Sequence, residues 1–213
     1  MVEANRNNFS HDTTTDEVLE GIDLTGRLAL VTGATSGLGA ETARALASRG
    51  AQAVITGRNM DKAATVVSDI KTSTGNDKVE IEELELDSLD SIRASAERFL
   101  TKYDALNLLV NNAGGMACPP GKTADGFEMQ FGTNHLGHFL LTGLIAPALQ
   151  KGSPARIVAL SSRGHQLSAV DFEDINFEQR PYNKWVSYGQ SKTANVLHVI
   201  ELESHLGKHG VHA

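Results

Sequence analysis

Residues 28–39 read Leu-Ala-Leu-Val-Thr-Gly-Ala-Thr-Ser-Gly-Leu-Gly and join a short apolar run to the helix-periodic segment Ala40–Ser48. An apolar run of this length, bounded by a turn, is typical of a buried strand. Three glycines in the turn allow the backbone to bend sharply and to approach a ligand closely. The segment therefore predicts a strand, a tight turn and a helix. The N-terminus of this helix would face the same ligand that the turn approaches.

The pattern then alternates between apolar runs and helix-periodic segments. The predicted strands are Leu28–Thr32, Ala53–Thr56, Val79–Leu84, Leu106–Val110 and Arg156–Leu160. The predicted helices are Ala40–Ser48, Lys62–Lys71, Leu89–Tyr103, Gly126–Gln150 with a possible end at Pro147, and Ser187–Leu206, with a polar loop at 163–186. Alternation of this kind predicts an α/β fold, a doubly wound parallel sheet with helices on both faces.

Length and composition indicate a single domain over residues 22–213, preceded by an N-terminal extension, residues 1–21, that we expect to be partly disordered. Within the extension, Thr14-Thr-Asp-Glu17 matches a capping box and predicts a short helical turn. The net charge is 19 − 26 = −7, which makes nucleic acid an unfavourable partner. One cysteine, no secretory leader and no apolar stretch of membrane-spanning length predict a cytoplasmic protein.

The glycine turn has the spacing Gly-x-x-x-Gly-x-Gly, and its place in the first strand–helix unit favours dinucleotide binding over a purely structural turn. The predicted cofactor-binding residues here are Gly33, Thr35, Ser36, Gly37, Leu38 and Gly39. An acidic residue at the tip of the second strand would favour NAD, but that strand ends in Thr56-Gly57-Arg58. Arg58 suits a 2′-phosphate, so we expect NADP (NADPH) rather than NAD; a solvated surface arginine is the alternative.

Tyr188 and Lys192 stand four residues apart in Tyr-Gly-Gln-Ser-Lys, a spacing that places both on one face of a helix. A fixed positive charge beside a phenol stabilises the phenolate, so the pair can exchange a proton near neutral pH. By itself the spacing is common in surface helices. Its meaning depends on the other motifs of the chain.

Taken together, these motifs resemble the short-chain dehydrogenase/reductase family from about Leu24 to the end of the chain. The resemblance rests on the glycine turn, Asp87, Asn111-Asn-Ala-Gly114, Asn134, Ser162, and Tyr188 with Lys192, which occur in the expected order. Phe131–Phe139, Arg156–Ser162 and Ser191–Leu197 look most like the branch of retinol dehydrogenases and WW-domain-containing oxidoreductases. The family implies a Rossmann-like fold and an NAD(P)-dependent enzyme.

The resemblance also implies residue roles. Tyr188 would be the general acid/base, and Lys192 would assist it and hold the nicotinamide ribose. Ser162, rather than its neighbour Ser161, would orient the substrate oxygen, and Asn134 would position a water beside Lys192. Further cofactor contacts are expected from Leu86, Asp87, Asn112, Ala113 and Gly114. Two alternatives stay open: Asp87 could be the N-cap of the following helix, and Asn111 and Asn112 could only tie the central strands together.

Other residues point away from metal chemistry. The pairs His135/His138 and His205/His209 lack a carboxylate or thiol in a ligand pattern, and we predict no metal. Cys118 is interpreted as a packed thiol. In this family Gly210-Val-His-Ala213 would enter a sixth strand, so we expect a sheet whose C-terminal strands are missing, in the N-terminal two-thirds of a longer enzyme.

The predicted function is NADP(H)-dependent hydride transfer to or from an apolar carbonyl or alcohol substrate. The alternative is a catalytically silent member of the same fold that binds nucleotide or a partner protein. The resemblance further implies a homodimer or homotetramer, because the family commonly associates through the last two long helices.

Overall fold

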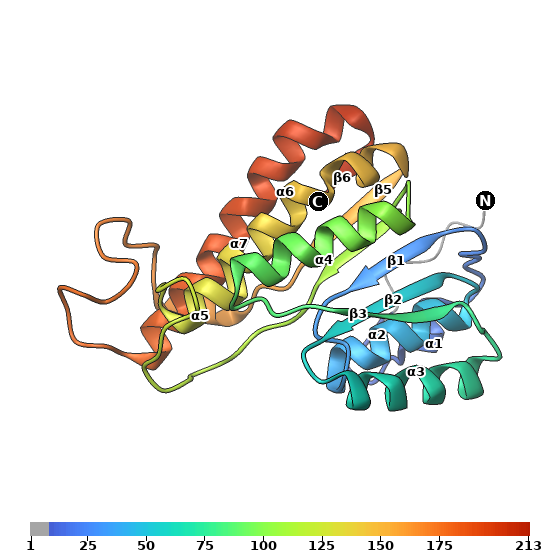
Figure 1. Cartoon of the computed structure of the whole chain (residues 1–213), viewed down its shortest axis with the longest axis horizontal. Coiled ribbons are helices and arrows are strands. Elements are labelled where there is room, and N and C mark those ends of the chain that lie inside the picture. Colours follow the sequence, from blue (N-terminus) through green and yellow to red (C-terminus); the bar gives the residue numbers. More distant parts are fainter. Residues whose placement is uncertain (1–8) are drawn as a thin grey trace.

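Six parallel strands form one sheet in the order β3-β2-β1-β4-β5-β6 in the computed structural model, which describes residues 9–213 (Figure 1). The strands are β1 (Leu28–Val31), β2 (Gln52–Gly57), β3 (Val79–Glu83), β4 (Leu108–Asn111), β5 (Ala155–Ala159) and β6 (Val211–His212). The strands β1 to β3 proceed from the centre of the sheet to one edge, and β4 to β6 proceed from the centre to the other edge. The strand order therefore reverses between β1 and β4, although all strands are parallel. The predicted doubly wound parallel sheet is confirmed.

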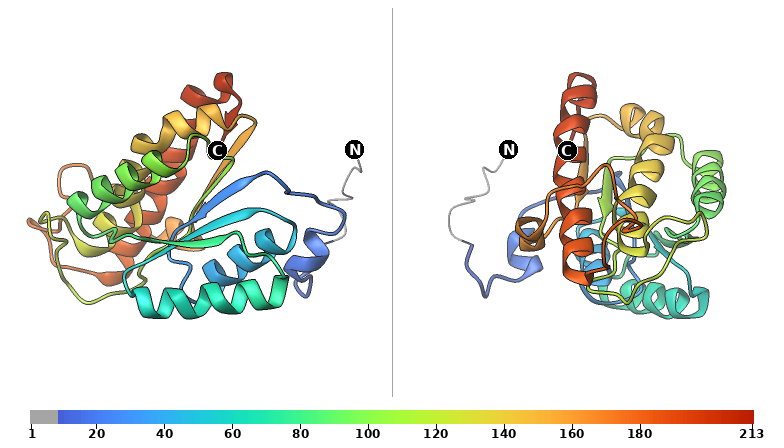
Figure 2. Two further views of the ribbon diagram at one scale, coloured as in Figure 1. Left: turned by 45° about the vertical axis from the view of Figure 1, so that its right-hand side comes forward. Right: turned by 90° about the vertical axis from the view of Figure 1, so that its left-hand side faces the viewer.

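Helices cover both faces of this sheet (Figures 1 and 2). One face carries α2 (Gly37–Ser48) and α3 (Met60–Thr74), and the other carries α4 (Leu89–Lys102), α6 (Gly137–Lys151) and α7 (Lys184–Leu206). Between residues 9 and 213, no helix is both long and apolar enough to cross a bilayer.

The two faces bury different side chains. The face under α4, α6 and α7 is filled by large residues, which include Phe99, Leu141, Ile145 and Leu149. The face under α2 and α3 is filled largely by alanines and small aliphatic residues, with Ala43, Ala47 and Ala63 fully buried. Small side chains let α2 lie close to β1, which brings the N-terminus of α2 near the strand tips.

Helix α3 is longer at both ends than the predicted helix Lys62–Lys71, because capping residues outside that range set its ends. Asn59 caps α3 by accepting from the Lys62 N–H at 2.8 Å, and Gly75 ends it with φ +69°. The capping box of Thr14 and Glu17 is present at α1 (Thr15–Val18), which is held against α2 by Arg44. The predicted partial disorder of residues 1–21 falls in part on residues 1–8, which lie outside the described residues.

The predicted helix Gly126–Gln150 is wrong in detail. The structure has α5 (Met129–Phe131), a π-turn (Gly132–Leu136) and α6, and Pro147 lies inside α6 instead of ending it. Pro147 is on the exposed face, so the backbone carbonyl that loses its partner can be solvated. The π-turn follows from side-chain contacts to the carbonyl of Asn134, which are described below.

Two further boundaries differ from the prediction. The polar loop 163–186 contains a 3₁₀ turn (Arg163–Leu167), and α7 begins three residues early at Lys184 because Asn183 accepts from the N–H groups of Trp185 and Val186. The expected sixth strand is present in short form: Val211 and His212 pair with Ala155 and Arg156 of β5. The outer edge of β5 is therefore paired at its start.

The packing predicts a large difference between two leucines. Leu141→Ala in α6 should lower the free energy of unfolding by about 3 kcal/mol, because Leu141 is 1% exposed in the core. Leu100→Ala in α4 should cost less than about 1 kcal/mol, since that side chain is 38% exposed. Urea unfolding measures both. Equal losses would contradict the assignment of the α6 face to the core.

Candidate active site

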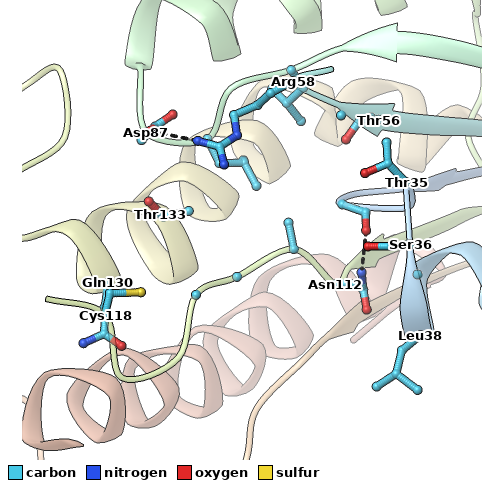
Figure 3. A pocket seen from close by; sticks show the side chains of 18 of the residues that line it. Thr35, Ser36, Leu38, Thr56, Arg58, Asp87, Asn112, Cys118, Gln130 and Thr133 are labelled. Carbon is cyan, nitrogen blue, oxygen red and sulfur yellow. Dashed lines mark hydrogen bonds and ion pairs between the residues drawn. The ribbon is translucent and has the colours of Figure 1, made fainter. Parts of the chain in front are cut away.

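A cavity of about 620 Å³ opens at the C-terminal ends of β1 to β4 (Figure 3). Ligands of doubly wound sheets bind at this end, where the strand order reverses. Its lining consists of Gly33, Thr35, Ser36, Leu38, Gly39, Thr56, Gly57, Arg58, Leu84, Leu86, Asp87, Asn112, Ala113, Gly114, Gly115, Cys118, Met129, Gln130 and Thr133. The predicted cofactor-binding residues are thus brought together, except that Gly37, Tyr188 and Lys192 do not line this cavity.

The glycine turn touches the segment after β4. A Cβ built on Gly33 would lie 2.7 Å from the Ala113 Cβ, and one on Gly39 would overlap the Asn112 amide. Gly33 also has φ +63° and Gly37 has φ +57°, which side chains rarely adopt. Glycine is therefore required for the two segments to form one floor of the cavity.

The N-terminus of α2 points its backbone donors at this floor. Ser36 is the N-cap, and its hydroxyl makes no capping hydrogen bond. The first N–H groups of a helix lack intrahelical partners and carry the positive end of the dipole. This end of the cavity is chemically suited to a pyrophosphate.

Thr32 joins the two halves of the floor. Its hydroxyl oxygen accepts from the backbone N–H groups of Asn112 at 2.9 Å and Ala113 at 3.0 Å, and it lies 2.8 Å from His138 Nε2. His138 Nδ1 lies 3.0 Å from the Asn134 carbonyl, so Nδ1 is the donor nitrogen and Nε2 accepts from Thr32. Burial lowers the pKa of His138 to about 4, which keeps the ring neutral, as this arrangement needs.

Asn111, the last residue of β4, and Asn112, the residue after it, both make hydrogen bonds that hold the structure together. Asn111 Nδ2 donates to Thr142 Oγ1 in α6 at 3.0 Å, and Asn112 Nδ2 donates to the Thr32 carbonyl at 2.8 Å. Asn112 also lines the cavity. Tying the strands together and facing a ligand are therefore compatible for Asn112, whereas Asn111 belongs to the packing between β4 and α6.

Asn134 sits in the π-turn and pairs with the backbone of Gly115. Its Oδ1 accepts from the Gly115 N–H at 2.8 Å, and its Nδ2 donates to the Gly115 carbonyl at 2.9 Å. The same Nδ2 donates to Ser191 Oγ in α7 at 3.0 Å. Asn134 is fully buried. It connects the end of the cavity at Gly114 and Gly115, which we call the inner end, to the helix that carries Tyr188 and Lys192.

Lys192 is buried beneath this junction. Its ammonium donates to the Leu160 carbonyl at 2.9 Å, and burial lowers the pKa of the Lys192 ammonium. Asn195 Nδ2 donates to the Leu160 carbonyl at 3.1 Å and to the Asn134 carbonyl at 3.2 Å. The amide of Asn195 thereby ties the end of β5 and the π-turn together next to Lys192.

Tyr188 and Ser162 face each other across Gly164. A Cβ on Gly164 would lie 2.7 Å from Tyr188 Cε1 and 3.4 Å from Ser162 Oγ. Ser161 instead donates to the backbone carbonyl of Lys192 at 3.0 Å. The Lys192 ammonium lies 5.6 Å from the centre of the Tyr188 ring. Of the two serines, Ser162 is the one beside Tyr188, which supports its predicted role.

Arg58 and Asp87 meet at the outer end of the cavity (Figure 3). Arg58 Nη1 lies 3.7 Å from Asp87 Oδ2. The N-cap of α4 is Ser88, which accepts from the Ser91 N–H, so the alternative that Asp87 caps this helix is wrong.

Several residues of the site were missed by sequence reasoning. They are Thr32, Thr56, Gly57, Leu84, Gly115, Met129, Gln130, Thr133, His138, Ser191 and Asn195. A polar Thr32 at the end of an apolar strand was a usable signal. His138 and Asn195 carried no comparable signal, because their role depends on contacts between distant elements.

His135, His138 and His198 lie near one another where the π-turn and α6 meet α7, and they do not form a set of metal ligands. The rings of His135 and His198 lie 5.8 Å apart edge to face, and His198 packs 4.8 Å from Phe139. Burial lowers the pKa of His135 and lowers the pKa of His198 to about 4. These rings are packed as neutral aromatic groups.

Comparison with known proteins identifies the class to which this fold and site belong. The family model described as "short chain dehydrogenase" matches residues 27–213. The chain belongs to this family of dehydrogenases.

Its curated relatives are longer. Retinol dehydrogenase 11 of Mus musculus is 46% identical over 190 residues, which cover 89% of this chain and 60% of that protein. Retinol dehydrogenase 13 of Homo sapiens is 45% identical over 186 residues, covering 87% and 56%. The chain therefore spans about 60% of the length of the curated relatives that it matches, and it falls in the branch expected from the sequence.

Solved structures with a similar fold lead to the same family. An uncharacterised protein from Mycobacterium paratuberculosis is 41% identical with a TM-score of 0.78, over 89% of this chain and 66% of that one. A metagenomic short-chain oxidoreductase in complex with NADP is 28% identical with a TM-score of 0.71, over 88% and 80%. A nicotinamide dinucleotide is therefore the cofactor class associated with this fold.

The lowered pKa of His198 predicts a pH-dependent stability. An unfolded histidine titrates near ~6.5, so between that pH and about 4 the unfolded state binds more protons and stability falls as the pH is lowered. Between pH 7 and pH 5, the free energy of unfolding should fall by about 2 kcal/mol less in His198→Phe than in the wild type, measured by urea unfolding. His209→Phe, on the exposed surface, is the control. An unchanged pH dependence in His198→Phe would contradict the neutral packing.

Proposed function

We propose that this protein is an NADP(H)-dependent oxidoreductase that moves a hydride between the nicotinamide and an apolar carbonyl or alcohol. One observation carries the proposal. The cavity that is suited to a phosphate runs past Gly114 and Gly115, and the Asn134 side chain links the backbone of Gly115 to α7, the helix that bears Tyr188 and Lys192. A dinucleotide lying along the cavity would then place its reactive end next to a proton donor.

The described residues fit such a cofactor. A side chain at position 33 would collide with Ala113, so the glycine keeps the cavity floor flat at this point. The N-terminus of α2 would hold the pyrophosphate, and Ala113 and Gly114 would allow close approach of the rest of the dinucleotide. The bound nicotinamide supplies or accepts the hydride.

The proton is handled by the protein. In reduction, the Tyr188 hydroxyl would donate to the carbonyl oxygen of the substrate, and in oxidation it would accept the proton. Ser162 would donate a hydrogen bond to the same oxygen and hold it while negative charge develops. Lys192, anchored by the Leu160 carbonyl, would supply a fixed positive charge behind Tyr188. The predicted water beside Asn134 stays a prediction.

The substrate class is inferred from the relatives. Those cited above are named as retinol dehydrogenases, and retinol is an apolar alcohol. The cavity beyond Gly115 is lined by both apolar and polar side chains, namely Cys118, Met129, Gln130 and Thr133. An apolar carbonyl or alcohol is the substrate chemistry that the names of the relatives support.

The preference for NADP over NAD rests on Arg58. Its guanidinium lies at the tip of β2 and lines the outer end of the cavity, where the adenosine ribose of a dinucleotide would lie. A guanidinium binds a phosphate with two parallel hydrogen bonds. Structures related to this chain have been solved in complex with NADP.

Association into a homodimer or homotetramer and a cytoplasmic location stay predictions. The first is supported by exposed apolar side chains on α6 and α7, among them Phe139, Leu197 and Ile200. Sedimentation velocity measures the oligomeric state, and a monomer at micromolar concentration would contradict the prediction.

Tyr188→Phe tests the catalytic proposal. With NADPH and a panel of aldehydes, ketones and quinones, turnover should fall by about 10²–10⁴-fold while NADPH binding is retained, because only the proton donor is lost. Tyr103→Phe at the end of α4 is the control and should keep wild-type turnover. If wild type and Tyr188→Phe both bind NADPH but neither turns over, the catalytically silent alternative is favoured.

Arg58→Ala tests the cofactor preference. The Kd for NADPH, measured by fluorescence titration, should rise at least tenfold because the partner of the 2′-phosphate is lost, and the Kd for NADH should stay within about twofold. Arg93→Ala on the exposed face of α4 changes the net charge equally and should leave both values unchanged. Equal Kd values for the two cofactors that do not respond to Arg58→Ala would contradict the preference for NADP.

A further inference from the structure

We propose that Asn195 is a positioning residue for the proton donor, because its amide fixes the backbone carbonyl to which the Lys192 ammonium donates. This inference rests on the proposed function and goes beyond it, because it gives a role to a residue outside the set of Asn134, Ser162, Tyr188 and Lys192. Asn195 does not line the cavity, so it acts through Lys192 and not through the cofactor or the substrate.

Asn195 continues the face of α7 that carries Tyr188 and Lys192. The three residues follow one another at steps of four and three, which place their side chains on one side of the helix. Lys192 is 6% exposed and Asn195 is 4% exposed. Both side chains are therefore shut off from solvent, where a polar group has to find its hydrogen-bond partners within the protein.

The Lys192 ammonium depends on one backbone anchor. It donates to the Leu160 carbonyl at 2.9 Å, and among residues 9–213 no carboxylate contributes to its pKa, which burial alone lowers. A Cβ built on Gly114 would lie 3.8 Å from Lys192 Nζ, so the ammonium stands beside the inner end of the cavity. A shift of the Leu160 carbonyl would therefore move this charge relative to both the cavity and Tyr188.

Asn195 holds the same carbonyl with a second donor. Its Nδ2 donates to the Leu160 carbonyl at 3.1 Å and to the Asn134 carbonyl at 3.2 Å. An amide nitrogen has two hydrogen atoms, so both bonds can form at once. The two carbonyl oxygens carry partial negative charge, and without a donor between them they would repel each other. The Asn195 amide thus keeps the anchor of Lys192 in place against the π-turn.

His135 fixes the orientation of this amide. Its Nδ1 lies 3.2 Å from Asn195 Oδ1, so the ring donates to the oxygen and leaves Nδ2 facing the two carbonyls. The His135 ring also packs against Phe131, with the ring centres 5.1 Å apart, and against Phe139, at 5.9 Å. Because these neighbours are aromatic, His135→Phe would keep the packing and lose the hydrogen bond.

The test is Asn195→Leu, which keeps the approximate size of the side chain and removes its donors. The Kd for NADPH, measured by fluorescence titration, should rise about fivefold, which corresponds to about 1 kcal/mol, because Lys192 is no longer held beside the cavity. For alcohol oxidation with NADP, the acidic limb of the pH profile of kcat/KM should move up by about one pH unit, because the cation stabilises the Tyr188 phenolate less. His135→Phe should change both values in the same direction, to a smaller extent.

Asn107→Leu is the matched control. The Asn107 side chain accepts from the Leu28 N–H at 2.9 Å and donates to the Gly152 carbonyl at 2.7 Å. It ties backbone segments together at the start of β1, at the opposite end of the sheet from the cavity. This variant should lower the free energy of unfolding and leave the Kd for NADPH and the pH profile unchanged.

A second arm repeats Asn195→Leu in the Lys192→Met background, where the Kd for NADPH should not rise further because Asn195 acts through Lys192. A further rise there would overturn the inference. A loss of stability in Asn195→Leu with wild-type Kd and pH profile would also overturn it and leave Asn195 a structural residue. If Asn195→Leu does not fold, wild-type values in His135→Phe are the contradicting result.

Each of these results leaves the proposed function intact. That function is contradicted separately if the wild type binds no dinucleotide, or if Tyr188→Phe keeps wild-type turnover.

Discussion

The paired hydrogen bonds between the Asn134 amide and the backbone of Gly115 are the interaction on which the rest of the site depends. They hold the segment after β4 against the π-turn, and the same amide reaches Ser191 in α7. Together with the hydrogen bonds that Gln130 donates to Lys184 and Ser187, they position the inner end of the cavity relative to the helix of Tyr188 and Lys192. Because a buried amide without partners costs free energy, this geometry is stabilised only when the three segments meet.

A second layer of polar groups supports this junction from below. The Asn134 carbonyl accepts from His138 Nδ1 and Asn195 Nδ2, and the other side of the His138 ring accepts from Thr32. The link in which His138 Nε2 accepts from Thr32 requires a neutral ring, and burial lowers the pKa of His138 to about 4, which provides that state. The glycine turn, the segment after β4 and the buried lysine therefore belong to one hydrogen-bonded unit, which in the proposed function would align phosphate binding with proton transfer. Buried networks of this kind specify one arrangement when all members are satisfied.

The sequence predicts the features that depend on interactions between near neighbours in the chain, and it misses those that depend on contacts between distant segments. The alternation of strands and helices, the glycine turn and the shared helix face of Tyr188 and Lys192 follow from local patterns, because periodicity and turn chemistry act over a few residues. The π-turn was missed because an uninterrupted helical pattern covers it. Only the side-chain donors of His138, four residues further along the chain, and of Asn195 in α7 distinguish the Asn134 carbonyl from its neighbours. The approach of Asp87 to Arg58 was missed for a related reason: strand tips can be located in the sequence, whereas the width of the cavity between them cannot.

The central claim is that one cavity binds the dinucleotide along the glycine turn and delivers its nicotinamide to Tyr188. A crystal structure of the protein with NADPH bound tests this most directly. The account predicts the pyrophosphate at the N-terminus of α2, the 2′-phosphate at Arg58, and the nicotinamide ring beside Gly114 within reach of the Tyr188 hydroxyl. A nicotinamide bound away from α7, or a pyrophosphate bound away from Gly33–Gly39, would contradict it.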